Sequence, residues 1–361
     1  MKEIGEKEVF RDDLTHSKRV KWRPVMDELI RGKVEKTVFS RLGIGLSLML
    51  FATSVFSYSA LSLVEFFAPE SMGNINVTIV VSMLTMYVIG IITYFFLKRW
   101  VPGNPINDPE DQAPVKIRPL GFMKLVLISL GLGFILNVAT ILMNFIKNSR
   151  DTFAEWSEYV RQYLEYGDTV VPEPPPLVEM DPLMDILGGL NPVVLILFVV
   201  VFTSIFEEFI FRKLLYDKLI AFGGKVFIIV SSLMFALFHV NQHQLIYTFG
   251  IGLVFAGVMY FTKKISYCIL LHMFFNLFGV LALQATSLPE GVMALYYVFH
   301  FGLVVLGIVF LIKWLSTYRL RIKFEPRESS IGKVKNIFIN PGMIVFVVIT
   351  VGVMILNDIM I

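Results

Sequence analysis

The chain alternates between long apolar blocks and shorter polar segments. Nine blocks come close to 20 residues, the length at which an α-helix crosses about 30 Å of hydrocarbon. They cover residues 43–67, 77–97, 122–146, 192–211, 226–243, 245–262, 266–284, 291–312 and 342–361. The pattern predicts an all-α polytopic membrane protein with about nine transmembrane helices. The ninth block follows Pro341-Gly342 and contains Asp358, so a helix lying at the membrane surface is an alternative there.

Composition supports the membrane assignment. Of the 361 residues, 56% are hydrophobic and 17% are charged, whereas soluble proteins average about 25% charged residues. The mean hydropathy is +0.70. A soluble globular protein is therefore excluded.

With one cysteine, Cys268, the chain has neither an internal disulfide framework nor a zinc site built from several thiolates.

The distribution of Lys and Arg predicts which polar segments face the cytoplasm, because positive charge gathers on that side of membrane proteins. Residues 1–42 carry 11 Lys and Arg, whereas residues 68–76 carry none. Of the 32 Lys and Arg in the chain, the segments predicted to face the other side contain Lys147, Arg150 and Arg161. We therefore expect a cytoplasmic N-terminus and a C-terminus on the opposite side.

These segments divide the chain into five predicted regions. They are a cytoplasmic N-terminal segment (1–42), three N-terminal transmembrane helices (43–146), an extracytoplasmic acidic and Pro-rich loop (147–191), a central group of helices (192–284) and two C-terminal transmembrane helices with a basic cytoplasmic loop (285–361). Inside the acidic loop, residues 153–163 have a helical pattern and the prolines that follow favour an extended chain. We expect this loop to be solvated; a lid or a substrate-binding surface is the alternative.

Ionisable side chains inside apolar blocks are the candidates for function, since a charge at the bilayer centre costs about 2.5–3.5 kcal/mol on insertion scales. Three blocks of the central region carry them: Glu207, Glu208 and Arg212 on one, His239 on the next, and His272 with Asn276 on a third. His300 in the eighth block is expected to hydrogen-bond a neighbouring helix. His243, beside Asn241 and Gln242, is expected to be a solvated turn residue.

Helical spacing separates the roles of these side chains. Glu208 and Arg212 are four residues apart, so they share a helix face and can pair. Glu207 lies about 100° around the same helix and has no such partner, which leaves it to face another helix as a general acid or base. His272 and Asn276 are also four residues apart, and together they can donate hydrogen bonds to one oxyanion.

A glycine pair at 223–224 predicts that Glu207 meets His239. Both residues lie 16 positions from the first of these glycines, so an antiparallel hairpin that turns there places them at equal height. His272 is harder to level with them, because it lies about 12 Å beyond the preceding turn. It requires either a tilted helix or a turn near Asn241 that does not reach the far surface, and both stay open.

Three motifs in this order resemble the CPBP family of intramembrane proteases, which includes the type II CAAX prenyl endopeptidases and the bacteriocin self-immunity proteins. The motifs are Glu-Glu-x-x-x-Arg from Glu207, Phe-x-x-x-His ending at His239, and His-x-x-x-Asn from His272. All three are complete and lie on separate apolar blocks. The resemblance covers residues 185–285, and the ninth predicted helix is additional to the eight-helix core associated with the family.

Carried over residue by residue, the resemblance implies an intramembrane endopeptidase of the CAAX protease type. Glu207 with His239 would activate a water molecule for attack on a peptide bond. His272 and Asn276 would bind the oxyanion that develops. The expected substrate is a membrane-associated peptide or protein, and the expected setting is the lipid bilayer of a prokaryotic cell membrane, crossed several times by the chain.

Members of the family are commonly labelled metalloproteases, so Zn²⁺ is a possible cofactor, with Glu207, His239 and His272 as its ligands. The same residues suffice for a metal-free glutamate mechanism, and the His-Glu-x-x-His signature is absent from the sequence. Glu208 and Arg212 would hold the site or one end of a substrate. Both mechanisms stay open.

Two other function classes also stay open. A catalytically silent interaction or immunity protein would keep its function without Glu207. A proton-coupled transporter would bury carboxylates and histidines in the same way, although transporters often repeat their pattern in two halves and this chain concentrates its polar residues in one third. The chain contains no surface of interleaved basic and aromatic residues, so no nucleic-acid partner is expected.

Overall fold

The computed structural model describes residues 5–103, 114–166, 173–176, 181–318 and 334–360, with side chains except at 5–31, 318, 334 and 358–360. All regular secondary structure in these residues is helical. The elements are α1 (Gly5–Phe67), η1 (Pro69–Gly73), α2 (Ile75–Trp100), α3 (Pro119–Tyr166), α4 (Pro182–Gly188), α5 (Pro192–Val194), η2 (Leu195–Phe202), α6 (Thr203–Glu208), η3 (Phe209–Leu214), α7 (Leu215–Leu219), η4 (Ile220–Phe222), α8 (Gly224–Phe238), α9 (Gln242–Thr262), α10 (Ile265–Ala285), α11 (Glu290–Tyr318), α12 (Val334–Phe338) and α13 (Pro341–Met360).

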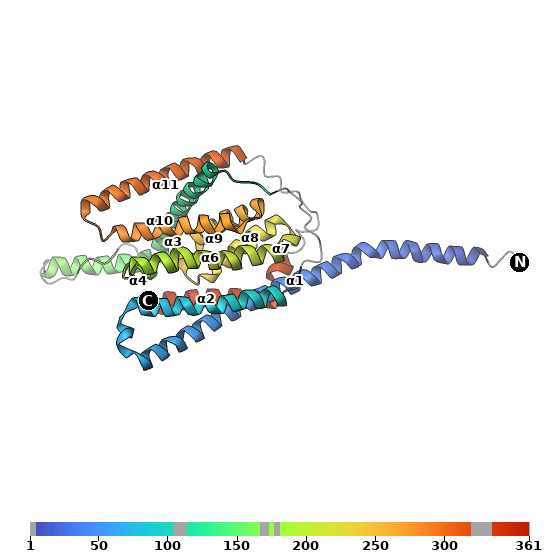
Figure 1. Ribbon diagram of the computed structural model, residues 1–361, viewed down its shortest axis with the longest axis horizontal. Helices are drawn as coiled ribbons and strands as arrows, with labels where there is room; N and C mark the ends of the chain where they lie inside the picture. Colours follow the sequence, from blue (N-terminus) through green and yellow to red (C-terminus); the bar gives the residue numbers. More distant parts are fainter. Residues whose placement is uncertain (1–4, 104–113, 167–172, 177–180, 319–333, 361) are drawn as a thin grey trace.

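The helices form a bundle with α6, α8, α9 and α10 at its centre (Figure 1). On one side, α1 and α2 make an antiparallel hairpin, and α13 packs against α1. On the other side, α3 packs along both α9 and α11. A continuous cluster of buried apolar residues joins these layers, and it includes Phe39 of α1, Phe211 of η3 and Phe255 of α9. The central helices are thus covered on both sides by apolar helices.

Seven of the described helices are long and apolar enough to cross a membrane. The predicted blocks 226–243 and 342–361 correspond to shorter helical stretches, Gly224–Phe238 and Pro341–Asn357. The prediction of about nine transmembrane helices is therefore supported for seven. The fifth predicted block corresponds to α8, which has 15 residues and a length of about 22 Å. This length is less than the hydrocarbon thickness.

Two predicted boundaries lie inside continuous helices. Helix α1 runs from Gly5 to Phe67, so no break separates the N-terminal segment 1–42 from the first apolar block. Helix α3 runs from Pro119 to Tyr166, so the helical pattern predicted at 153–163 is confirmed, and this helix is continuous with the third apolar block. Residues 134–166 contain no proline or glycine that would stop the helix, so the sequence does not mark a boundary there. The basic segment 319–333 lies outside the described residues.

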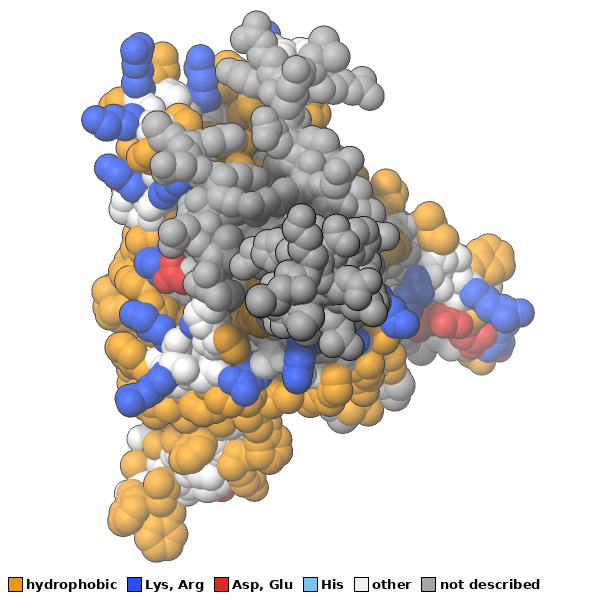
Figure 2. Space-filling view, turned by 90° about the vertical axis from the view of Figure 1, so that its right-hand side faces the viewer, with side chains coloured by type: hydrophobic (Ala, Val, Ile, Leu, Met, Phe, Trp, Pro, Cys, Tyr) orange, Lys and Arg blue, Asp and Glu red, His pale blue; other side chains and the backbone are white. Residues whose placement is uncertain are grey.

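Basic side chains gather at one end of the bundle. Figure 2, which views the molecule from the end toward which the N-terminal part of α1 extends, shows Lys and Arg side chains around that end beside a broad hydrophobic surface. Two elements meet there through Lys218 of α7, whose Nζ donates to the carbonyl oxygens of Lys98 (2.9 Å) and Val101 (2.8 Å). This clustering supports the predicted cytoplasmic face, and the orientation of the chain in the membrane stays a prediction.

Glycines allow α3 and α11 to approach closely. A Cβ atom on Gly307 of α11 would overlap the backbone of Leu127, and one on Gly131 of α3 would overlap the backbone of Gly307 and Ile308. Small residues at such crossings let two membrane helices gain close van der Waals contact. By contrast, a Cβ on Gly302, also on α11, meets no heavy atom within 4 Å.

We predict that Gly307→Ala destabilises the fold and that Gly302→Ala does not. The added methyl group at residue 307 forces α11 away from α3, and overpacking of this kind costs about 1–3 kcal/mol. Thermal unfolding of the purified variants in detergent measures the difference. Equal unfolding temperatures for the two variants would contradict the close crossing.

Candidate active site

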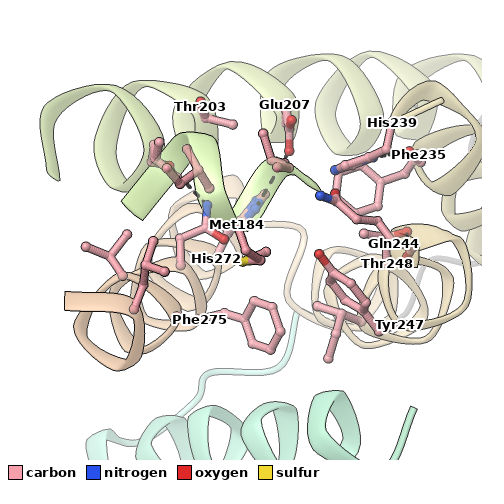
Figure 3. A pocket seen from close by; sticks show the side chains of 18 of the residues that line it. Met184, Thr203, Glu207, Phe235, His239, Gln244, Tyr247, Thr248, His272 and Phe275 are labelled. Atoms are coloured by element: carbon pink, nitrogen blue, oxygen red, sulfur yellow. Dashed lines mark hydrogen bonds and ion pairs between the residues drawn. The ribbon is translucent and has the colours of Figure 1, made fainter. Parts of the chain in front are cut away.

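The central helices enclose a cavity of about 340 Å³. Its wall includes Glu207 of α6, His239 at the end of α8, and His272 and Asn276 of α10, so side chains from all three sequence motifs meet in one place (Figure 3). Most of the remaining wall is apolar and comes from α2, α4, α9 and α10. Glu207 and His239 both line this cavity, and their direct contact at equal height stays a prediction.

The segment that carries Glu207 is an α-helical piece between two π-helical segments, η2 and η3. A π-helical turn displaces backbone carbonyl groups from the regular α-helical ladder, and such turns are frequent at functional sites. Side chains of neighbouring helices bind these carbonyls: Tyr87 of α2 donates to Phe198 (2.8 Å), Asn276 to Val199 (3.1 Å), and Ser231 of α8 to Phe211 (2.6 Å). Contacts from three helices thus position Glu207.

Glu208 is completely buried beside Glu207 and binds two partners. Its Oε1 accepts a hydrogen bond from His272 Nδ1 at 2.9 Å, and its Oε2 lies 3.3 Å from Arg212 Nε in an ion pair. The pairing of Glu208 with Arg212 is as the sequence predicted. The contact with His272 was not predicted, because it joins helices 64 residues apart in sequence.

Arg212 is also fully buried, and its guanidinium makes no hydrogen bond with the described residues. Its Cζ lies 4.2 Å from the centroid of the Phe235 ring and 5.3 Å from that of Phe255, so cation–π contact replaces hydrogen bonding. Both rings line the cavity, whereas Arg212 does not. Of its two predicted roles, the geometry favours holding the site over binding one end of a substrate.

His272 lies between the two carboxylates. With Nδ1 donating to Glu208, its Nε2 faces Glu207 Oε2 at 3.7 Å, too far for a direct hydrogen bond. His239 has a similar arrangement, since its Nδ1 donates to the Phe235 carbonyl oxygen at 2.8 Å and leaves Nε2 free of that contact. A hydrogen bond at one ring nitrogen sets the orientation and the role of the other. Both rings are thereby oriented within the cavity wall.

Asn276 lines the cavity, but its amide nitrogen is occupied. It donates to Val199 O (3.1 Å) and to Ser204 Oγ (3.2 Å), which ties α10 to η2 and α6. An amide nitrogen has two hydrogens, so neither is left for a substrate oxyanion in this arrangement. Asn276 therefore positions the helix that carries Glu207, and its predicted oxyanion role stays a prediction.

His243 and His300 lie outside the cavity wall. The Nδ1 of His243 forms a hydrogen bond with Asn144 Nδ2 of α3 at 3.0 Å, so it joins two helices and is more than a solvated turn residue. His300 is within hydrogen-bonding distance of the Tyr296 hydroxyl, 3.2 Å away on the same helix. We expected a partner on a neighbouring helix, and the structure places it one turn earlier on α11.

The predicted zinc ligands do not form a metal-binding set in this arrangement. Among the described residues, no group of three or more His, Cys, Asp or Glu side chains is placed to hold a metal ion. Glu207 and His272 face each other across the cavity, while His239 bonds to the backbone of its own helix. Zinc binding by Glu207, His239 and His272 stays a prediction.

Asp181, which sequence reasoning missed, links a wall of the cavity to the α8–α9 turn. Its carboxylate accepts hydrogen bonds from Leu183 N (3.1 Å) at the start of α4, from Asn241 Nδ2 (3.0 Å) and from Gln244 Nε2 (3.2 Å). Helix α4 places Met184 and other apolar side chains in the cavity wall. The available signal was the helix-start pattern Asp-Pro at 181–182.

We predict that Asp181→Ala loosens α4 and that Asp185→Ala does not. Both changes remove one carboxylate from the same short segment, but only Asp181 caps α4 and binds the α8–α9 turn, and loss of a cap costs about 0.5–2 kcal/mol. Hydrogen exchange of the amides at 183–188 should be faster in Asp181→Ala. If exchange is equally fast in both variants, Asp181 does not hold α4.

Comparison with known proteins gives a family match and a similar protein. The family of type II CAAX prenyl endopeptidases described as Rce1-like matches residues 189–278, which contain all three motifs. The membrane-embedded CAAX protease MroQ of Staphylococcus aureus (strain USA300) is 32% identical over 116 residues, which are 30% of this chain and 47% of that protein. The chain thus matches about half the length of this relative.

No solved structure matches the chain. The family match begins just before α5, ends within α10, and covers the three helical segments whose side chains meet in the cavity. The sequence resemblance and the match therefore rest on the same residues. Residues 189–278 of this chain therefore match the Rce1-like family of type II CAAX prenyl endopeptidases, which belongs to the group of proteases that the three motifs resemble.

Proposed function

We propose that this protein is an intramembrane endopeptidase in which Glu207 activates water to hydrolyse a peptide bond. One observation carries the proposal: the Glu207 carboxylate lines a cavity among membrane helices and faces His272 Nε2 across 3.7 Å. The side chain of Glu207 is 14% exposed, whereas the neighbouring Glu208 is fully buried. Of the two adjacent carboxylates, Glu207 can therefore reach a substrate.

In the proposed mechanism, a water molecule binds between Glu207 and the histidines. Its oxygen attacks the carbonyl carbon of the peptide bond while Glu207 takes one of its protons. His272, held by Glu208, takes part in its doubly protonated form: it donates a hydrogen bond from Nε2 to the oxyanion and keeps both ring protons throughout the reaction. Glu207 then delivers its proton to the departing nitrogen as the C–N bond breaks, which leaves a carboxylic acid and an amine.

The cavity also suits a membrane-associated substrate. Its wall is mainly apolar, with Met83 and Met86 of α2 on one side and Phe275 of α10 on another, and a few polar groups converge on one place. Sites of this type bind an apolar chain and orient it through a small number of polar contacts. We propose a peptide or protein of the lipid bilayer as the substrate.

We predict that Glu207→Gln abolishes peptide cleavage. The amide has almost the shape of the carboxylate but cannot accept a proton, and loss of a general base lowers rates by about 10²–10⁴-fold. Cleavage of a membrane-peptide library by the purified protein in detergent measures the effect. Glu290→Gln, at an exposed site at the start of α11, is the matched control and should retain activity.

The cleavage assay, a test of cellular function and an uptake measurement together separate the remaining alternatives. Activity that survives treatment with a chelator supports the metal-free mechanism, while activity lost to the chelator and restored by Zn²⁺ supports a metal at Glu207, His239 and His272. If the wild type cleaves no peptide and Glu207→Gln still performs the cellular function, the protein is an interaction or immunity protein. Uptake driven by a proton gradient would instead indicate a transporter.

We predict that His272→Ala lowers the cleavage rate by at least about 10²-fold and that His300→Ala leaves it unchanged. His272 faces Glu207 in the cavity, whereas His300 forms a hydrogen bond with Tyr296 on α11. Rates in the same peptide assay, together with thermal unfolding, test the pair. If His272→Ala does not fold, His272→Asn serves in its place, because its amide can still donate to Glu208. Equal rates for His272 and His300 variants would argue against the assignment.

A further inference from the structure

One face of α10 forms a continuous strip of the cavity wall. His272, Asn276, Gly279 and Leu283 all line the cavity, at intervals of four, three and four residues. These intervals keep the four positions on one side of an α-helix. The strip therefore leads away from the proposed reaction centre at His272 and passes over Gly279, where no side chain covers the helix.

Nothing in the packing requires glycine at residue 279. A Cβ atom there meets no heavy atom within 4 Å, whereas one on Gly133 or Gly250, which also lie in the bundle, would press against a neighbouring side chain. The backbone does not require it either, because among the described glycines Gly223 is the one with a positive φ. Glycine weakens a helix interior relative to alanine. What it provides at this position is open space.

The space beside Gly279 has apolar walls. Val280 is buried and belongs to the same apolar cluster as Leu187 of α4, and both line the cavity. Leu283, one turn further along α10, lines it as well and approaches α4 near Gly188. The carboxylate and imidazole groups of the cavity, Glu207, His239 and His272, belong to the proposed reaction centre. The other polar side chains of its wall are uncharged and come from Thr203, Gln244, Tyr247, Thr248 and Asn276. An apolar group fits the space at Gly279, and a charged one does not.

Distance along the helix relates this space to the peptide bond that is cut. Gly279 lies seven residues after His272, which corresponds to about 10 Å along the helix axis. An extended peptide advances about 3.3 Å per residue. A substrate chain that runs along α10 from the reaction centre therefore reaches Gly279 about three residues from the scissile bond.

We infer that Gly279 opens an apolar subsite that accepts a large aliphatic or aromatic side chain of the substrate, about three residues from the scissile bond. The inference rests on the proposed endopeptidase function and adds a specificity determinant to it. A leucine in place of Gly279 would fill the subsite from the wall and would exclude large side chains while admitting small ones.

The test uses purified full-length protein in detergent and a series of peptides that share one cleaved sequence. Each peptide carries Ala, Leu or Phe at a single position, up to four residues on either side of the scissile bond. For one position about three residues away, the ratio of kcat/KM for the Phe peptide to that for the Ala peptide should fall by about tenfold or more in Gly279→Leu. The matched control is Gly302→Leu on α11, which adds the same side chain in open space outside the cavity and should keep the wild-type ratio.

Binding measurements separate this inference from the function on which it rests. Glu207→Gln should bind the same peptides without cutting them, so fluorescence anisotropy in that background, with and without Gly279→Leu, measures the subsite independently of turnover. A preference for large side chains that Gly279→Leu reverses supports the subsite even if no peptide is cleaved, an outcome that would overturn only the proposed function. A loss that is equal for Ala, Leu and Phe peptides, or an unchanged ratio, overturns the subsite.

Discussion

The site depends on one buried carboxylate. Glu208 has no exposed surface, yet it binds Arg212 on its own helical segment and His272 on α10. Removing Arg212 would cost about 3–5 kcal/mol, because the buried charge of Glu208 would be left uncompensated. The hydrogen bond from His272 to Glu208 is the contact that fixes the height of α10 relative to α6. The neighbouring residue Glu207 is thereby held in front of His272 Nε2. The buried charge of Glu208 is compensated by Arg212, which does not line the cavity.

The two π-helical segments around α6 extend the same principle to the backbone. A carbonyl without its regular partner inside a membrane bundle must find another donor. Tyr87, Ser231 and Asn276 supply these donors from three different helices. Each contact ties the backbone of this segment to a neighbouring helix and so specifies where that helix sits, although the Phe198 carbonyl also accepts from Thr203 on its own helix. This explains why a side chain expected to bind an oxyanion, Asn276, is already occupied by the helix that carries Glu207.

Periodicity and buried charge predicted much of this arrangement. The apolar blocks located the helices, and the four-residue spacing identified the pair Glu208–Arg212. The contact of His272 with Glu208 could not be predicted, because a pattern along one helix contains no information on which helix lies opposite. The continuity of α3 to Tyr166 escaped prediction for another reason: polar helix and polar loop have similar composition. Asp181 was missed because its partners lie 60 and 63 residues away.

The short helix α8 explains how polar backbone groups come to lie beside the cavity among apolar helices. With 15 residues it ends at Phe238, and the next helix begins at Gln242, so the turn that follows His239 is not helical. Non-helical backbone at membrane depth is tolerated where protein or a wet cavity satisfies it. Here Asn357 of α13 donates to the Val240 carbonyl oxygen at 3.3 Å, and Asp181 accepts from Asn241. The C-terminal helix, additional to the predicted family core, thus supports the turn beside His239, and the polar groups of that turn adjoin the place where the proposed reaction consumes water.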